Sequence, residues 1–287
     1  MKQLLFKILR FSGIPFLLRE LIQESKVSII ILHDPDKDTI DNCFKYWKKH
    51  YNIISLNEFI EALEKGSSSK LPRKSMVITF DDGHIGNYSI LDKIKEYNIP
   101  LTIFICSSIV GTNRGFWFNQ DISFSERRKL KLMSNEERLK YLSSIGFSQN
   151  SNLNSPTALQ HTHINEMKEF VNFQSHGRFH PIFTQCSFEE VSNEILESKE
   201  ELEMKFNLEV NALAYPNGDY SLREMEIAKK GGYKCALTID GGYSDLDQNP
   251  FKLKRLGISD SANLDEIVVK SSGLWSYMEK IKFWFYK

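Results

Sequence analysis

The chain has 287 residues, a length that suits one α/β barrel or two small domains and exceeds that of a minimal binding module. Hydrophobic residues make up 41% and charged residues 26%, as in ordinary soluble globular proteins. The 37 basic residues balance the 37 acidic residues, so no global field attracts nucleic acid and we expect no nucleic-acid partner.

Residues 1–25 are expected to form an amphipathic segment. Most of its apolar residues share one helical face, and Lys2, Lys7 and Arg10 lie largely elsewhere, which suits an interfacial helix on a membrane. The alternative, given equal weight, is a helix packed on the protein's own surface. The basic residues interrupt the apolar run and no small-residue cleavage site follows, unlike in a signal peptide. With four scattered cysteines, this favours a cytoplasmic protein, peripheral on the inner face of the membrane.

Short apolar strands then alternate with helices. We expect strands near 26–32, 51–54, 75–80, 101–105, 171–174, 212–215, 235–239 and 251–256. Alternation of this kind predicts a distorted (β/α) barrel of about seven parallel strands, formed by residues 26–262 as a single domain. Residues 112–169 are polar and indicate a helical insertion, and 263–287 indicate a C-terminal helix rich in aromatic and basic residues.

Unusual polar residues follow three of the buried strands. His33 follows the first, Asp81 and Asp82 follow SMVITF, and His176 follows VNFQS. In a parallel barrel all strands open their carboxyl ends onto one face, so these residues are expected to converge there. Two adjacent buried acids are costly without compensation, and a metal ion is the usual compensation.

His176 and His180 are four residues apart, which predicts two imidazoles on one face of a helical turn that ends at Pro181. One carboxylate and two imidazoles leave coordination positions open, as in catalytic sites. The expected cofactor is one divalent metal ion. Zinc is the default, and cobalt, nickel or manganese also suit such ligands.

Three segments resemble motifs of the polysaccharide deacetylase family (NodB homology, carbohydrate esterase 4). They are TFDDG at 79–83, SHGRFHP at 175–181 and AYPNG at 214–218. The resemblance implies that Asp81 is the catalytic base and that Asp82, His176 and His180 bind the metal. It also implies that Tyr215 and the backbone N–H of Asn217 bind the substrate and its oxyanion.

ILHD at 31–34 is similar to the family's last motif, whose histidine is the general acid, here His33. It precedes TFDDG, an order similar to that of the circularly permuted members that act on poly-N-acetylglucosamine. The family's usual arginine partner of the base is absent from 212–214, and Arg255 is the candidate replacement. Asp240 is the candidate for the acid that orients His33.

The function that the resemblance implies is metal-dependent removal of the acetyl group from an N-acetylated sugar of a polysaccharide or a lipid-linked glycan. An O-acetyl esterase and an inactive glycan-binding relative are the alternatives, and the oligomeric state is open. Some residues also have structural interpretations. Asp81 and Asp82 could cap a helix, and His33 could belong to the core. His84, His161 and His163 are expected to face solvent, and Trp117 and Phe118 to stack on a sugar or pack in the core.

Overall fold

A computed structural model describes residues 2–66 and 71–285. Within these ranges the strands are β1 (Ser28–Leu32), β2 (Asn52–Ile53), β3 (Ser75–Phe80), β4 (Leu101–Ile105), β5 (Val171–Ser175), β6 (Ala212–Ala214), β7 (Cys235–Gly241) and β8 (Leu253–Gly257). The helices are α1 (Lys2–Phe11), α2 (Ile14–Leu17), α3 (Lys37–His50), α4 (Leu56–Lys65), α5 (Leu91–Tyr97), α6 (Phe124–Leu130), α7 (Asn135–Ser144), α8 (His161–Met167), α9 (Phe188–Phe206), α10 (Leu222–Lys230), α11 (Leu264–Ser271) and α12 (Leu274–Phe285).

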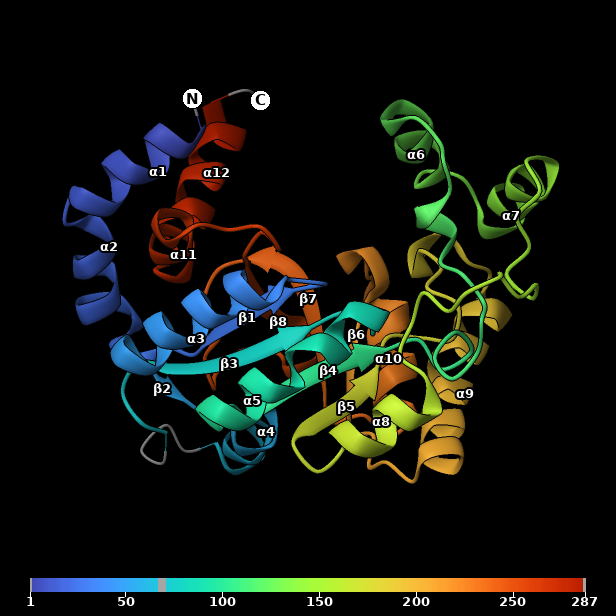
Figure 1. Ribbon diagram of the computed structural model, residues 1–287, viewed down its shortest axis with the longest axis horizontal. Coiled ribbons are helices and arrows are strands. Elements are labelled where there is room, and N and C mark those ends of the chain that lie inside the picture. Colours follow the sequence, from blue (N-terminus) through green and yellow to red (C-terminus); the bar gives the residue numbers. More distant parts are fainter. Residues whose placement is uncertain (1, 67–70, 286–287) are drawn as a thin grey trace.

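Seven parallel strands of the described residues close into a barrel, in the order β1-β8-β7-β6-β5-β4-β3 and back to β1 (Figure 1). The first strand closes the ring, because Ile31 pairs with Thr79 of β3 on one side and with Gly257 of β8 on the other. The short β2 pairs only with the start of β3. The expected barrel of about seven parallel strands is therefore confirmed.

Apolar side chains point to both faces of the strands. Alternate residues, such as Ile29, Val77 and Phe104, form an inner cluster with Leu56 and Phe59 of α4, so α4 packs against one end of the barrel interior. The other residues of β1, β3 and β4 form a second cluster with the surrounding helices. Strands buried on both faces are mostly apolar, with buried exceptions such as Thr79 of β3, Gln174 of β5 and Arg255 of β8.

Residues between β4 and β5 form a lobe beside one end of the barrel, with α6 and α7 projecting from it (Figure 1). Ser123 and Ser134 begin these two helices with capping boxes to Glu126 and Glu137. The lobe has a small apolar core of Trp117, Leu130, Leu142, Phe147 and Ile182.

The N-terminal and C-terminal helices pack against each other on the other side of the barrel end (Figure 1). Phe6 is buried with its ring 4.8 Å from that of Trp275, and Arg10 forms an ion pair with Asp265 at 2.7 Å. Two helices, α11 and α12, replace the single helix expected near the C-terminus. The chain turns at Gly273 with φ 74°, where a Cβ atom would lie 2.5 Å from the Tyr243 hydroxyl.

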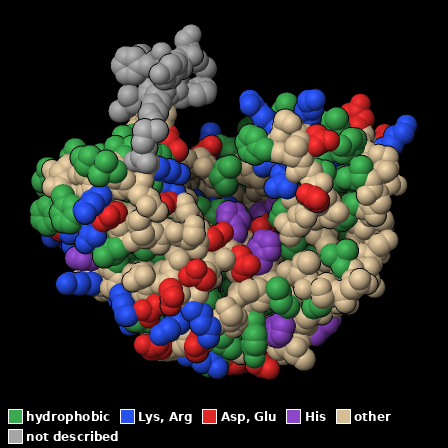
Figure 2. All heavy atoms as spheres, turned by 45° about the horizontal axis from the view of Figure 1, so that its top comes forward, with side chains coloured by type: hydrophobic (Ala, Val, Ile, Leu, Met, Phe, Trp, Pro, Cys, Tyr) green, Lys and Arg blue, Asp and Glu red, His purple; other side chains and the backbone are tan. Residues whose placement is uncertain are grey.

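The opposite side of α1 and the following turns is apolar and exposed. This surface, called the N-terminal apolar face below, consists of Leu4, Ile8, Phe11, Ile14, Phe16, Leu17, Leu21 and Ile22. Figure 2 shows hydrophobic side chains gathered over this part of the molecule, at the left. Among the described residues, no helix combines the length and apolar character that crossing a bilayer requires. The aromatic and basic side chains after Lys280 lie outside the described part.

Candidate metal centre and active site

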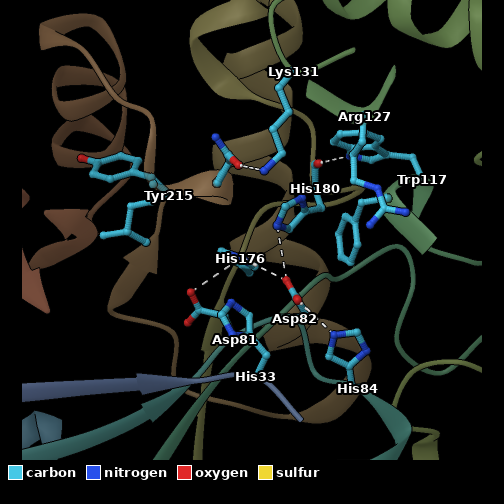
Figure 3. A pocket seen from close by; sticks show the side chains of 14 residues that line it. His33, Asp81, Asp82, His84, Trp117, Arg127, Lys131, His176, His180 and Tyr215 are labelled. Atoms are coloured by element: carbon cyan, nitrogen blue, oxygen red, sulfur yellow. Dashed lines mark hydrogen bonds and ion pairs between the residues drawn. The ribbon is translucent and has the colours of Figure 1, made fainter. Parts of the chain in front are cut away.

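A cavity of about 440 Å³ lies between the insertion lobe and the barrel, at the carboxyl ends of the strands. Figure 2 shows histidine side chains at the bottom of this hollow, and Figure 3 shows the lining residues from close by. The lining consists of His33, Asp81, Asp82, His84, Trp117, Phe118, Arg127, Lys131, His176, His180, Tyr215, Asn217, Gly218 and Ile239.

Three buried side chains converge at the bottom of the cavity. Asp82 follows β3, and His176 and His180 follow β5. Asp82 Oδ1 lies 3.3 Å from His176 Nε2 and 3.3 Å from His180 Nε2, and one ligand atom from each residue lies within 4.8 Å of the others. His161 and His163 do not join them, since they stack on Phe206 and Tyr88 respectively.

The donors and acceptors of this group fit a metal ion. His176 Nδ1 lies 2.8 Å from the carbonyl oxygen of Ala214, so a neutral ring donates there and turns its Nε2 lone pair towards Asp82. Asp82 Oδ1 is buried and accepts no hydrogen bond of good geometry within the described part of the chain. Lone pairs that face one another in a buried site need a cation between them.

Protons compete with a metal ion for the space between these three side chains. Burial would lower the pKa of His176, but Asp81 and Asp82 outweigh it and raise this pKa. Burial would raise the pKa of Asp82, yet the neighbouring histidines lower it well below its usual range. A divalent cation has to displace a proton from the imidazole, so metal affinity depends on pH.

The segment that carries the two histidines is not the helical turn that their spacing predicted. Gly177 has φ 76° and His180 has φ 59°, which are left-handed conformations. Pro181 disfavours the α conformation for the residue before it. Glu194 of α9 shapes the loop by accepting the backbone N–H of Arg178 at 2.7 Å and of Phe179 at 3.0 Å.

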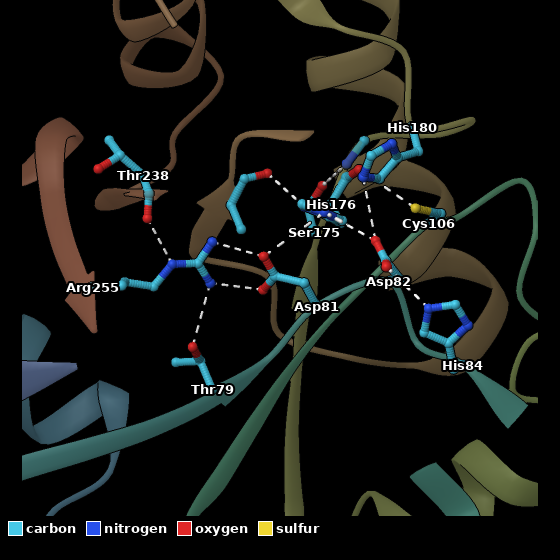
Figure 4. A network of polar contacts seen from close by, with 12 residues as sticks. Thr79, Asp81, Asp82, His84, Cys106, Ser175, His176, His180, Thr238 and Arg255 are labelled. Carbon is cyan, nitrogen blue, oxygen red and sulfur yellow. Dashed lines mark hydrogen bonds and ion pairs between the residues drawn. The ribbon is translucent and has the colours of Figure 1, made fainter. Parts of the chain in front are cut away.

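Asp81 and Arg255 form a buried bidentate ion pair beside the three ligands (Figure 4). Nη1 of Arg255 lies 2.7 Å from Oδ1, and Nη2 lies 2.7 Å from Oδ2. The guanidinium is held in turn by the carbonyl oxygen of Thr238 at 2.7 Å. Burial would raise the pKa of Asp81, but Arg255 and then His176 lower it, so Asp81 stays a carboxylate. Arg255 therefore lies beside Asp81, where the sequence predicted the arginine partner of this acid.

His33 lines the cavity next to Asp81 (Figure 3). The residue that holds it is not Asp240, which was the expected partner. Asp240 is exposed and accepts a hydrogen bond from the Tyr220 hydroxyl at 2.8 Å. Asp260 accepts the backbone N–H of His33 at 2.9 Å instead. β7 extends to Gly241 with a register shift between Leu237 and Gly241, so Asp240 is the last residue but one of the strand and does not follow it.

His84 also differs from expectation. Its side chain faces the cavity with its Nε2 3.1 Å from the second carboxylate oxygen of Asp82. The ring packs 5.0 Å from that of Phe116. His84 therefore holds the oxygen of Asp82 that does not face the two ligand histidines, as groups around metal ligands commonly do.

Aromatic residues and a turn form the cavity walls. Trp117 donates from Nε1 to the carbonyl oxygen of His180 at 2.8 Å, and the Phe118 ring lies 4.8 Å from the His180 ring. Across the cavity, Tyr215 is buried and its hydroxyl donates to the carbonyl of Phe251. Its hydroxyl is therefore engaged away from the ligands. Asn217 lines the wall with φ 58°, and its side chain accepts from Lys131.

The model of the family described as "Polysaccharide deacetylase" matches residues 68–236, more than half of the chain. The chain belongs to the polysaccharide deacetylase family. Its first strand lies between β8 and β3, so the motif that ends in His33 joins the others despite coming first in the chain.

Sequence and structure relatives are distant. The poly-β-1,6-N-acetyl-D-glucosamine N-deacetylase of Staphylococcus epidermidis is 24% identical over 75% of this chain and 65% of its own length. The chain spans less than two thirds of the length of the curated relatives that it matches first, 59% and 65%. The Streptococcus pyogenes deacetylase PplD, solved with acetate, matches with a TM-score of 0.64 at 20% identity, over 86% of this chain and 98% of that chain. IcaB from Ammonifex degensii matches with a TM-score of 0.62 at 14% identity, over 86% and 97%. At these identities the likeness in structure shows the fold.

Sequence reasoning missed several residues around the site. Asp260 comes after β8 in GISD, which is a strand-end position of the kind that identified His33 and Asp81. Glu194 lies within a regular helix, where nothing in the sequence separates it from its exposed acidic neighbours. Arg127 and Lys131 belong to the insertion, whose approach to the cavity depends on tertiary packing.

Proposed function

We propose that this protein is a metal-dependent hydrolase that removes the acetyl group from an N-acetylated sugar of a polysaccharide or lipid-linked glycan. The observation that carries the proposal is the convergence of Asp82, His176 and His180, whose buried lone pairs face one another beside the Asp81–Arg255 ion pair. Family membership and the 440 Å³ cavity above these residues support it.

These three residues would hold a divalent cation, which would supply Lewis acidity and make water a usable nucleophile near neutral pH. Asp81, kept ionised and oriented by Arg255, accepts the proton of the attacking water. His33, which follows the neighbouring strand β1, donates a proton to the departing nitrogen. The backbone N–H of Asn217 is the candidate donor to the oxyanion. Acetate and a free amino sugar are the products.

The acid and base favour an amide over an ester. An amine leaves a tetrahedral carbon only after it is protonated, whereas an alcohol is a better leaving group and depends less on an acid. The site has separate candidates for the two proton transfers in Asp81 and His33, which follow β3 and β1. An O-acetyl esterase would need the second one less.

The test measures acetate release from matched N-acetylated and O-acetylated oligosaccharides, before and after chelator treatment and after return of zinc, cobalt, nickel or manganese. We expect release from the N-acetylated series, loss with chelator and recovery with metal. The Asp82→Ala variant should lose both metal and activity, and His161→Ala, a histidine outside the site, should keep both. Release only from esters would favour the esterase. Sugar binding without acetate release under any metal would favour an inactive glycan-binding protein.

We also propose that the protein works in the cytoplasm against the inner face of the membrane. Two features support this location. The N-terminal apolar face leaves eight large apolar side chains in contact with water, and four buried thiols are unpaired.

A further inference from the structure

Two cationic side chains of the insertion lobe line the wall of the cavity above the proposed metal site. Arg127 lies in α6, and Lys131 follows the end of that helix. Both face the same cavity as Asp82, His176 and His180 (Figure 3). They come from the segment outside the three resembling motifs, so the proposed hydrolysis does not use them.

Neither cation has an acidic partner within the described part of the chain. Arg127 donates from Nη2 to the carbonyl of Gln120 at 3.3 Å, and its buried Nε makes no hydrogen bond there. Lys131 Nζ donates to the amide oxygen of Asn217 at 2.5 Å. The amide nitrogen of Asn217 in turn donates to Asp219, so a neutral group separates the lysine from that carboxylate.

The acids inside the cavity are already engaged. Asp81 is paired with Arg255, and Asp82 faces the two imidazoles and His84. The positive charges of Arg127 and Lys131 are therefore not offset by the cavity itself. Partly enclosed charges of one sign raise the local concentration of the opposite charge, and a buried donor without an acceptor is costly unless a ligand supplies one.

We propose that Arg127 and Lys131 bind an anionic group of the substrate, a phosphate or a carboxylate, next to the sugar whose acetamido group lies at the metal site. This inference rests on the proposed function. A guanidinium matches the two oxygens of either anion, and the ammonium group adds a point charge. The phosphate of a lipid-linked sugar and the carboxylate of an acidic sugar share this chemistry, so the substrate is a charged glycan and not a neutral homopolymer.

The test compares kcat/KM of the metal-loaded enzyme on three matched substrates. These are a neutral N-acetylglucosamine oligomer, the same oligomer with a terminal 1-phosphate, and an oligomer in which the neighbouring sugar is a uronic acid. We expect at least one charged substrate to be favoured by tenfold or more, the usual effect of a charge-assisted hydrogen bond. The preference should fall as sodium chloride rises from low to high concentration.

Arg127→Gln and Lys131→Gln should each lower this preference by about tenfold, because kcat/KM falls more for the charged oligomer than for the neutral one. Arg128→Gln and Lys129→Gln are the matched controls, because these neighbours are exposed and do not line the cavity. They remove the same charge from the same helix and should leave the preference intact. Arg127→Lys, which keeps the charge without the planar fork, should retain part of it.

Three results would separate the possible failures. Equal kcat/KM for neutral and charged oligomers would overturn the anionic substrate and leave the deacetylase intact. An equal loss on all substrates in Arg127→Gln and Lys131→Gln would show that these residues only tie the lobe to the barrel. Absence of acetate from every substrate would reject the proposed function. Calorimetry with the phosphorylated oligomer on Asp81→Asn then measures binding at the anion site without turnover. If the oligomer does not bind, or if adding Lys131→Gln does not weaken its binding, the anion site is overturned.

Discussion

The surroundings of Asp81, the proposed base, fix both its charge and its direction. Arg255 contacts both carboxylate oxygens at 2.7 Å, and the carbonyl of Thr238 holds the guanidinium. A buried carboxylate without such a partner would take up a proton and could not accept one from water. The ion pair therefore keeps Asp81 ionised, as a metal ion in the proposed site would keep Asp82.

Asp81→Asn should keep the metal and lose activity by about 10²–10⁴-fold, because an amide cannot accept the proton. It also leaves the charge of Arg255 buried without a counter-ion, which typically costs about 3–5 kcal/mol of stability. Metal content, steady-state rates and denaturant unfolding measure the three effects. Near-normal turnover in a metal-loaded variant would mean that Asp81 is not the base.

His33→Ala should slow amide hydrolysis by about 10²–10⁴-fold, the usual contribution of a general acid. The loss should be much smaller on an activated aryl acetate, whose leaving group departs without a proton. His163→Ala, which removes a histidine from the insertion lobe, is the matched control. An equal loss on both substrates would assign His33 to packing and not to proton transfer.

At the level of single residues, the sequence predicts which polar residues reach the cavity when they directly follow a buried strand. Asp81, Asp82, His33 and His176 all reach the cavity for this reason, since the ring of parallel strands brings their ends together. Asp240, the expected orienting acid, accepts a hydrogen bond from Tyr220 instead, and β7 continues one residue beyond it. The two residues by which β7 extends past its apolar run leave no clear mark in the sequence pattern.

At the scale of elements, the loop after β5 depends on a carboxylate from a helix. Glu194 in α9 is buried and accepts two backbone N–H groups of the loop. Burial raises the pKa of Glu194 to about 7, although the N–H groups of Phe179 and Arg178 favour its ionised form. The conformation of the loop after β5 therefore depends on Glu194, a carboxyl group with a pKa of about 7.

This coupling predicts how stability changes with pH. The pKa of Glu194 is higher in the folded protein than in the unfolded chain, so the folded state binds the extra proton between about pH 4.5 and 7. Protonation of Glu194 therefore stabilises the folded state below that window. This stabilisation is lost as the pH rises through the window, and the free energy of unfolding falls by about 3 kcal/mol in total. Glu194→Gln cannot ionise and should flatten this part of the profile.

Thermal or denaturant unfolding from pH 4.5 to 8, in a fixed metal state, measures the difference between Glu194→Gln and the wild-type protein. Glu197→Gln, which removes a more exposed acid from the same helix, is the control and should follow the wild type. A constant difference between Glu194→Gln and wild type at all pH values would contradict the raised pKa.

The spacing of His176 and His180 predicted that their side chains converge, but it predicted the wrong backbone conformation. A helical turn brings residues i and i+4 together, but the chain achieves the same approach with left-handed residues at Gly177 and His180. The spacing in the sequence indicates that the two imidazoles can approach each other. It does not determine the backbone conformation of the residues between them. The glycine and the proline of SHGRFHP are the residues that could have indicated an irregular loop.

At the scale of the whole molecule, the N-terminal apolar face is an unusually hydrophobic surface to leave exposed to water. Leu4, Ile8 and Phe11 are 63%, 60% and 71% exposed, while the other side of α1 packs Phe6 against the C-terminal helices. Lys2 and Lys7 are also exposed on this helix. Apolar side chains flanked by lysines match the boundary of an anionic lipid surface.

We therefore expect the protein to sediment with vesicles that contain anionic lipid and to bind neutral vesicles more weakly. Replacing Ile8 and Phe11 by serine should reduce partitioning by tenfold or more, because each large apolar side chain contributes about 1.5–3 kcal/mol when fully buried. Phe188→Ser, which removes an exposed phenylalanine from α9 on another side of the molecule (Figure 1), is the control. Full recovery of the wild type in the supernatant would contradict membrane contact.

The closure of the barrel by its first strand has a consequence for the timing of biosynthesis. β1 can pair with β3 soon after both leave the ribosome, but its second neighbour, β8, is made about 170 residues later. At roughly 5–20 residues per second, β1 waits about 10–35 s with an open edge, which is a site for wrong pairing with other chains. Arg255 arrives with β8, so Asp81 receives its partner only when the ring closes. An unfinished chain therefore has Asp82, His176 and His180 but neither a closed barrel nor a paired Asp81, so the proposed hydrolysis would begin only with the completed fold.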